Sequence, residues 1–433
     1  MKKRYFKVGI FLTVTLIWSG LAWAAEYSLS ELYAQALKNS EKIKMAEENI
    51  YIAQMGQYKA LSLLIPRLTA TAGYSRYTEQ KYSAAGVLIQ PNEGGTWTVR
   101  ADQTFTLNAR ELDALKVAGQ TIKKTEYDLE TAKSDYLLAV ASSYYDVLKA
   151  KKALEIATAN MARLSQYRNS VETRVKVGEQ TKTALLRAEG ELSGARAEYV
   201  KATNALLLSR AALMRATGVE DDFRLKEEKN PLSGEHELRE LRKTALESRA
   251  DLKSYDMQTQ MAARQVKYAQ GAFWPNVGLF AVYNGADQNP VTASLNRESV
   301  YGGVSLSFPF FEGGLRMAEL KEARAKERQA RLMYEDAKKS VDVELQGAYL
   351  ELETLKGSLV YLSDQLTFAQ DNYDSVLRQY ENGLATSLDV MDANNLLLTS
   401  EKNYADTLYG YQLAQLKVRK SSGTLLRVVE TQK

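Results

Sequence analysis

Apolar residues recur along one long stretch of the chain at steps that alternate strictly between four and three. The positions are Val341, Leu345, Ala348, Leu352, Leu355, Leu359, Leu362, Leu366, Ala369, Tyr373, Val376 and Tyr380. A seven-residue period sustained over this length predicts helices that pack side by side as a coiled coil. At about 1.5 Å per residue this seam spans roughly 60 Å, which is too long for a compact globular core.

A second seam of the same kind lies 205 residues earlier, from Tyr136 to Val175. Its positions are Tyr136, Val140, Ser143, Val147, Ala150, Leu154, Ala157, Met161, Leu164, Arg168, Val171 and Val175. Only Ser143 and Arg168 interrupt the apolar pattern. The chain therefore contains two long helices of one design.

Glycine follows the end of each seam and marks a predicted helix turn. Gly178 and Gly383 stand where a left-handed C-terminal residue is expected. The segment 386–389, Thr-Ser-Leu-Asp, then has the spacing of a capping box at the start of a new helix. Each long helix is therefore expected to fold back into an antiparallel helical pair.

Four shorter segments follow a period of two instead. Between Trp97 and Leu107, for example, apolar residues alternate with Thr, Arg and Asp. This pattern predicts strands with one apolar and one polar face, at about 66–77, 96–108, 275–284 and 299–311. Polar loops are expected at 78–95 and 285–298. Aromatic residues gather near the strand ends, as in a membrane-interface girdle, although tyrosine is also frequent in ordinary sheets. They are Tyr74, Tyr77, Tyr82, Trp97, Trp274, Tyr283 and Tyr301.

The chain is a tandem duplication. Residues 31–66 match residues 240–275 at an offset of 209, and residues from about 115 to 218 match a later copy at an offset of 205. The four-residue difference falls where helix-like sequence gives way to strand-like sequence. We therefore divide the chain into a first repeat at 25–218, a linker at 219–237, a second repeat at 238–424 and a C-terminal tail at 425–433.

The first residues predict a secretory signal peptide at 1–24. Basic residues precede a short apolar run, and Ala22-Trp23-Ala24 forms a small-residue cleavage site. Without the four basic residues of this segment, 53 basic residues face 53 acidic ones, so no basic patch indicates a nucleic-acid partner. The chain has no cysteine and one histidine, His236, so we expect no disulfide, no metal site and no cofactor.

Four strands are too few to span a membrane alone. Membrane strands must close into a barrel, because an open edge leaves backbone groups unpaired in lipid. The smallest such barrels have about eight strands. Copies must therefore join, and three subunits would supply twelve strands.

The whole pattern resembles the TolC-type family of outer-membrane efflux proteins. The resemblance is carried by the tandem repeat, by Pro66 and Pro275 at the changes from helix to strand, by the segment 308–314 (Phe-Pro-Phe-Phe-Glu-Gly-Gly) and by the segment 383–393 at the helix turn. It implies a mostly α protein with membrane β-structure: a homotrimer with a twelve-strand β-barrel in the lipid of the Gram-negative outer membrane. Long coiled-coil helices would form a periplasmic α-barrel.

The resemblance also implies partners and a passive function. The α-barrel would narrow to a constriction that opens when a periplasmic adaptor (membrane fusion) protein and an inner-membrane pump dock. The chain would be a channel subunit of a tripartite efflux or type I secretion system, a conduit whose energy comes from those partners.

The resemblance places three residues at the constriction. Asp389 and Asp392 match acidic positions that ring the pore, although both also suit the positive end of a helix. Tyr380 matches a tyrosine of the closed-state hydrogen-bond network, and it also completes the apolar seam. The family's arginine–aspartate latch is absent, because its two positions read Ala385 and Ala184.

Two other functional classes stay open. A periplasmic coiled-coil adaptor or structural protein of an export complex would also carry helical hairpins, but it would lack four matched strands. An enzyme is disfavoured, because the sequence has no Ser/His/Asp, Cys/His or phosphate-loop arrangement. Whether the exported cargo is a drug, a metal ion or a protein stays open.

Overall fold

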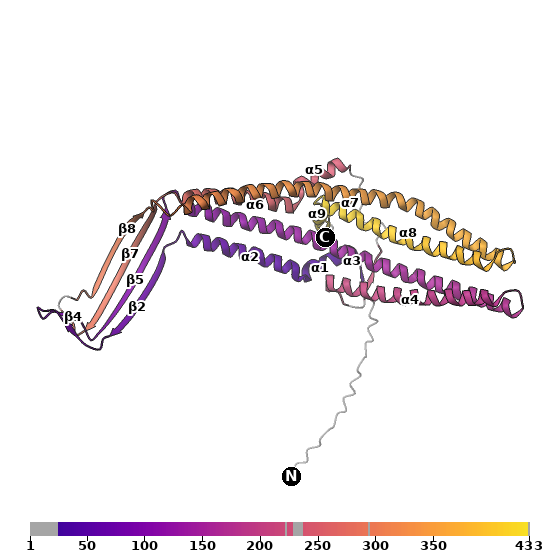
Figure 1. Ribbon diagram of the computed structural model, residues 1–433, viewed down its shortest axis with the longest axis horizontal. Helices are drawn as coiled ribbons and strands as arrows, with labels where there is room; N and C mark the ends of the chain where they lie inside the picture. Colours follow the sequence, from indigo (N-terminus) through magenta and orange to yellow (C-terminus); the bar gives the residue numbers. More distant parts are fainter. Residues whose placement is uncertain (1–24, 221–222, 228–236, 293–294, 432–433) are drawn as a thin grey trace, which may run out of the picture.

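The computed structural model describes residues 25–220, 223–227, 237–292 and 295–431. The predicted signal peptide at 1–24 and His236 lie outside this part of the chain. The protein is a long bundle of helices with a sheet at one end and two helical hairpin turns at the other (Figure 1).

Two helices of 67 residues run the length of the bundle, α3 (Arg110–Lys176) and α7 (Leu315–Glu381). Each turns back into a shorter helix, α4 (Lys182–Thr217) or α8 (Ser387–Ser421). At about 1.5 Å per residue, α3 and α7 are each roughly 100 Å long. The predicted antiparallel helical pairs are present, since α3 packs on α4 and α7 packs on α8.

Both predicted seams lie inside the bundle. Every one of their residues is buried or half-buried, including Ser143 and Arg168. Arg168 binds Glu172 and Glu189, and its neighbour Tyr167 occupies the buried position instead. The interruption at Arg168 therefore marks a local change in which residue faces the core.

Kinked helix pairs precede the strands of each repeat and pack along α3 and α7. In the first repeat the kink is at Ser40, whose hydroxyl accepts a hydrogen bond from the N–H of Ile43. In the second repeat it is at Arg249. The predicted tail contains one further helix. These helices are α1 (Leu29–Asn39), α2 (Glu41–Ser62), α5 (Leu238–Ser248), α6 (Ala250–Gly271) and α9 (Leu425–Thr431). Among the described residues, no helix has the length and apolar character needed to cross a membrane.

Four antiparallel strands form one sheet in the order β2–β5–β7–β8. Their bounds are β2, Arg67–Arg76; β5, Glu93–Thr106; β7, Asn276–Asn289; and β8, Glu298–Ser307. The register brings the two repeats together at the centre of the sheet, where β5 pairs with β7 over its whole length.

The register places the predicted apolar residues of all four strands on one face. Across one row, for example, Ala70, Val99, Tyr283 and Val300 are partners. The other face is mostly Thr, Ser, Asn and Gly. On the apolar face Trp97 lies over Gly285, where a side-chain Cβ would come within 1.9 Å of the indole.

Several expectations about the strands were wrong in detail. β7 continues to Asn289 instead of ending near 284, because its residues 285–289 pair with β5, so the loop expected at 285–298 is shorter. β8 ends at Ser307 rather than 311, because its partner β7 begins at Asn276 and Pro309 has no N–H to donate. The loop expected at 78–95 contains a small hairpin, β3 (Lys81–Tyr82) with β4 (Leu88–Gln90). Tyr301, taken as a girdle residue, lies on the polar face, because it pairs with Val282 and not with Tyr283.

The linker expected at 219–237 contains a strand. β6 (Phe223–Leu225) pairs in parallel with β1 (Ala25–Tyr27), the first described residues of the chain. Tyr144 of α3 donates a hydrogen bond to the carbonyl of Lys226, just after β6. The start of the first repeat and the linker that follows it are therefore joined at the middle of the bundle.

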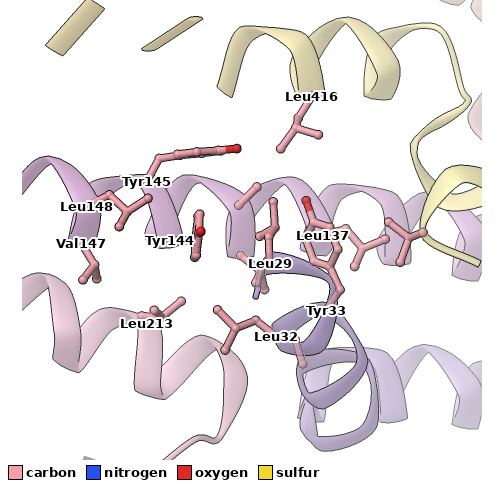
Figure 2. Packing of buried hydrophobic residues seen from close by; sticks show 14 of the residues in the cluster. Leu29, Leu32, Tyr33, Leu137, Tyr144, Tyr145, Val147, Leu148, Leu213 and Leu416 are labelled. Atoms are coloured by element: carbon pink, nitrogen blue, oxygen red, sulfur yellow. The ribbon is translucent and has the colours of Figure 1, made fainter. Parts of the chain in front are cut away.

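The main core lies where α1, α3, α4 and α8 meet (Figure 2). Tyr144 and Tyr145 of α3 pack edge to face at 5.1 Å, and Leu213 of α4 and Leu416 of α8 close the cluster from two sides. This core joins the helical pairs of the two repeats near the middle of the rod. A second apolar cluster joins them again near the hairpin turns, with Leu164 and Ala195 from the first repeat and Ala369 and Leu397 from the second.

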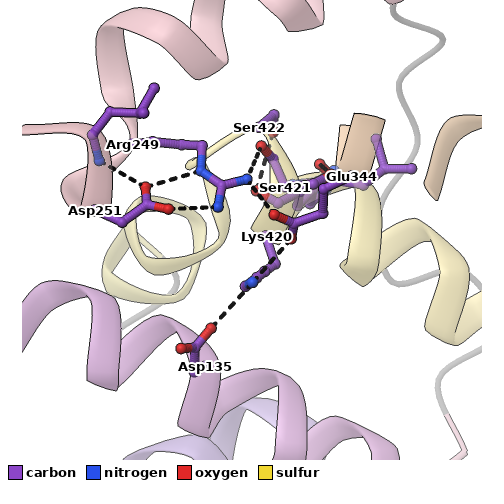
Figure 3. A network of polar contacts seen from close by, with 10 residues as sticks. Asp135, Arg249, Asp251, Glu344, Lys420, Ser421 and Ser422 are labelled. Atoms are coloured by element: carbon purple, nitrogen blue, oxygen red, sulfur yellow. Dashed lines mark hydrogen bonds and ion pairs between the residues drawn. The ribbon is translucent and has the colours of Figure 1, made fainter. Parts of the chain in front are cut away.

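A network of charges crosses the same level of the bundle at the kink between α5 and α6 (Figure 3). The guanidinium of Arg249 donates to both carboxylate oxygens of Asp251 at 3.0 and 2.7 Å, and to Glu344 at 2.8 Å. Lys420 extends the network from Glu344 (3.0 Å) to Asp135 of α3 (3.2 Å). Side chains from four helices are thereby joined, with Arg249 buried at the centre of the network and Asp135 exposed at its edge.

Candidate functional site at the helix tips

The two hairpin turns at the far end of the bundle share one geometry. Gly178 and Gly383 follow α3 and α7 with φ of +82° and +76°. In each turn the glycine N–H donates three residues back, and the next residue's N–H donates five residues back, to Arg174 or Gln379. This is the Schellman arrangement, which favours glycine because only glycine adopts a positive φ without strain.

The capping box predicted at Thr386 is confirmed. The Thr386 hydroxyl accepts the N–H of Asp389 at 3.3 Å, and the Asp389 carboxylate accepts the N–H of Thr386 at 2.7 Å. Hydrogen bonds from the backbone and side chain of Thr386 hold the pKa of Asp389 below its ordinary value. This carboxylate is therefore ionised at neutral pH while it caps α8.

Asp392 lies one turn further along α8 and has a different environment. Its side chain is exposed and makes no hydrogen bond or ion pair with any residue in the part of the chain that the structure describes. Its neighbours Met391 and Ala393 are buried, so both aspartates lie on the exposed side of α8. The first repeat has Ala184 and Arg187 at the matching positions, so the acidic pair belongs to the second repeat alone.

Tyr380 is buried at the end of α7 and packs against the first repeat. Its ring lies 5.4 Å from that of Tyr167, and the guanidinium of Arg174 lies 5.0 Å from its centroid. Its hydroxyl has no hydrogen-bond partner among the described residues. Within one chain, Tyr380 therefore contacts the first repeat through its ring and not through its hydroxyl.

Two side chains of the first repeat, Tyr167 and Arg174, donate hydrogen bonds to the tip of the second repeat. Arg174 of α3 donates to the carbonyl of Glu381 at 2.7 Å, and the Tyr167 hydroxyl donates to the hydroxyl of Ser387 at 2.6 Å. Burial raises the pKa of the Tyr167 phenol, so this donor keeps its proton. We call Tyr167, Arg174, Tyr380, Glu381 and Ser387 the tip contact.

Further polar contacts hold α3 against α8 above the turns. Arg163 forms a double hydrogen bond with the carboxylate of Glu401 at 3.2 and 3.0 Å, and both side chains are largely buried. The amide of Asn394 donates to Asn160 at 2.9 Å inside the bundle. Of the tip contact only Tyr380 was predicted from the sequence, and the residues that hold α3 against α8 were not predicted. Only the interruption at Arg168 indicated a polar change in the seam.

The tips bring together no obvious catalytic or metal-binding group. Within residues 25–220, 223–227, 237–292 and 295–431, no cluster of three or more His, Cys, Asp or Glu side chains is placed to hold a metal ion. A cavity of about 760 Å³ lies between α3, α7 and α8, and the charged residues that line it are two lysines and four acids: Lys151, Lys152, Glu155, Glu227, Asp371 and Glu401. The tips therefore present the exposed carboxylates of Asp389 and Asp392, next to the hydrogen bonds and ring contacts of the tip contact.

The chain is similar throughout its length to known bacterial channels. The family model "Outer membrane efflux protein" matches two segments, residues 32–219 and 241–424. Outer membrane protein TolC of Vibrio cholerae is 24% identical over 418 residues, which cover 94% of this chain and 92% of that protein. The cation efflux system protein CusC of Escherichia coli K12 is 24% identical over 425 residues, covering 90% and 85%.

The fold has the same relatives among solved structures. The CmeC outer membrane channel of Campylobacter jejuni superposes with a TM-score of 0.80 at 18% identity, over 92% of this chain and 86% of that one. Each of the two segments matched by the family model contains one full set of kinked helices, paired strands and helical hairpin.

Proposed function

The chain belongs to the outer membrane efflux protein family, and on that premise we propose that three copies close one pore with Asp389 and Asp392 at its narrow end. The protein is a channel subunit of the Gram-negative outer membrane that works with a periplasmic adaptor and an inner-membrane pump. The sheet would form the membrane barrel and the helical pairs would form the periplasmic tube.

One observation carries the proposal: an apolar-faced sheet with two open edges. Among the described strands, β2 pairs only with β5 and β8 pairs only with β7. In lipid each unpaired backbone group costs several kcal/mol, so these edges must find partners. Edges of other copies supply them, and three sheets of four strands make a twelve-strand barrel, an even number.

The helices support the same assembly. Large apolar side chains also lie exposed on α4 and α7, on the sides away from the seams. On α4 they are Leu186, Val200, Leu207 and Leu208, and on α7 they are Leu332, Val343, Leu350, Val360, Tyr361 and Phe368. Several are spaced by multiples of seven, as expected of a second coiled-coil face that another copy covers. We assign no catalytic step to the chain.

Planar bilayer recordings test the function. The purified full-length protein in detergent should insert and conduct ions in discrete steps, because a closed barrel leaves a water-filled lumen. A periplasmic adaptor or structural protein would bind membranes weakly or not at all and give no steps. Absence of discrete conductance at any protein concentration would reject the channel.

Removing the charge of both aspartates should lower cation selectivity. Six carboxylates around one axis attract cations and repel anions, so the double variant Asp389→Asn/Asp392→Asn should move the cation-to-anion permeability ratio toward one. Asparagine is chosen because its side-chain oxygen at position 389 can still accept a hydrogen bond from the N–H of Thr386, the N-cap residue of α8. Reversal potentials in a KCl gradient measure the ratio.

The control for this experiment is Glu247→Gln on the exposed side of α5, away from the tips. This variant should leave the ratio unchanged. An unchanged ratio in the double aspartate variant as well would show that these carboxylates do not line the pore.

A further inference from the structure

The polar face of the sheet is uneven along its length. Its cross-strand rows can be read directly from the register of the four strands. Toward the outer end they read Thr71, Thr98, Asn284 and Ser299, and toward the helices they read Thr104, Gly278 and Ser305. These rows offer small polar groups and no charge.

Two neighbouring rows between them hold every charged and aromatic residue of this face within the paired strands. The first row is Arg67, Asp102, Phe280 and Gly303, and the second is Thr69, Arg100, Val282 and Tyr301. We call these two rows the wall band. An apolar or aromatic group is unexpected here, because the opposite face already carries the apolar residues that lipid would cover.

Contacts within the wall band arrange its aromatic rings and its charges. The Arg100 guanidinium binds Asp102 at 2.7 and 2.8 Å and lies 5.2 Å from the centre of the Phe280 ring. Phe280 and Tyr301 meet edge to face at 6.3 Å, and Tyr301 is half exposed. A Cβ on Gly303 would come within 2.7 Å of the Phe280 ring, so glycine leaves room for that ring to lie against the strand.

The band carries one unbalanced positive charge. Arg100 neutralises Asp102, whereas the side chain of Arg67, the register partner of Asp102, makes no ion pair or hydrogen bond with any described residue. Arg67 is also exposed. A free guanidinium therefore lies on the same face as two aromatic rings, two strands away from Phe280.

We propose that the wall band forms a ring on the lumen wall that binds solutes combining a flat aromatic ring with a negative charge. The inference rests on the proposed function, because only a closed barrel turns the polar face into a lumen. The aromatic edges and faces of Phe280 and Tyr301 contact the ring of the solute, and Arg67 attracts its charge. Three bands surround the lumen, and each binds weakly, as a conduit requires if its cargo is to leave.

Single-channel recordings in planar bilayers test the band with 1-naphthalenesulfonate as the probe. It should reduce the current through the unaltered channel in a concentration-dependent manner, whereas methanesulfonate, which has the charge without the ring, should not at the same concentration. In Phe280→Thr the half-blocking concentration should rise about three- to tenfold. In Arg67→Gln it should rise about two- to fivefold, and added salt should diminish this difference.

The controls separate binding from packing. Tyr283→Thr removes an aromatic ring from the same strand on the opposite face and should leave block unchanged. If Phe280→Thr does not assemble, Arg67→Gln decides, because Arg67 contacts no other described side chain through a polar bond. Equal block in all variants, or equal block by methanesulfonate, would overturn the inference. Channels that conduct without block would reject the band and leave the proposed function intact, whereas no conductance would reject both.

Discussion

Replacing Arg249 with alanine is expected to lower the free energy of unfolding by about 2–4 kcal/mol. Its guanidinium is largely buried and satisfies Asp251 and Glu344 together with the carbonyl of Ser421. Removing one partner of a buried ion pair costs about 3–5 kcal/mol, because the remaining charges stay desolvated. Glu344 is more than one-third exposed and keeps Lys420, so the expected loss is smaller. Circular dichroism of the detergent-solubilised protein should show a thermal midpoint several degrees lower.

The first repeat provides the matched control for this variant. Ser40 occupies the same kink at an offset of 209 and acts there only as a helix N-cap. Ser40→Ala should therefore cost about 1 kcal/mol. An equal loss of unfolding free energy in Ser40→Ala and Arg249→Ala would show that the charge network does not stabilise the kink between α5 and α6.

The stability that this network contributes depends on pH. Burial alone would raise the pKa of Asp251 and Glu344, but hydrogen bonds and charge from Arg249 and Lys420 outweigh it, and both pKa values lie below the ordinary range. A carboxyl group whose pKa is lower in the folded than in the unfolded protein stabilises the fold at a pH above its unfolded pKa, which is about 4. This stabilisation is lost as the pH falls through the folded pKa. The difference in unfolding midpoint between the unaltered protein and Arg249→Ala should therefore shrink below about pH 4.

Loosening the tip contact is expected to raise the open probability of the channel. The double variant Tyr167→Phe/Arg174→Ala removes the hydrogen bonds to Ser387 and Glu381 and the cation over the Tyr380 ring. Together these contacts are worth about 3 kcal/mol, at roughly 1 kcal/mol each. A shift of that size changes an equilibrium more than a hundredfold. Bilayer recordings should show longer or more frequent openings and a larger mean current.

Arg168 is the control for the tip variant. It lies on the same stretch of α3, but it binds Glu172 and Glu189 within its own hairpin. Arg168→Ala should leave channel opening unchanged. If the tip variant behaves like Arg168→Ala, the contact between repeats does not restrain the pore.

Much of the fold could be predicted because the chain repeats simple periods. A period of seven determined which residues of α3 and α7 face inward, and a period of two determined which strand residues share a face. The ends of the strands were less predictable, because a strand ends where its neighbour in the sheet has no residue left to pair with it. β8 ends at Ser307 because that residue pairs with Asn276, the first residue of β7. Tyr301 was grouped with the girdle residues because it lies near a strand end, although the alternation of Val304 and Leu306 already places it on the opposite face, as the register shows.

The polar connections between repeats could not be predicted. Arg249 and Glu344, or Arg174 and Glu381, stand far apart in the sequence, and no periodic pattern links them. Local motifs fared better: the Thr386 capping box depends only on residues three apart and was found correctly. The roles of Asp389 and Asp392 in the pore stay a proposal that the selectivity measurement addresses.

In the proposed channel the open edges of three sheets close on one another. The chain has no cysteine, so introduced pairs are the only thiols present. Ala70→Cys on β2 can be combined in turn with Val300→Cys, Val304→Cys or Leu306→Cys on β8, all on the apolar face. Oxidised outer membranes should contain, for at least one pair, a covalent trimer as the largest product on a non-reducing denaturing gel. Monomers alone in every pair, or a ladder that continues beyond three, would contradict closure by three copies.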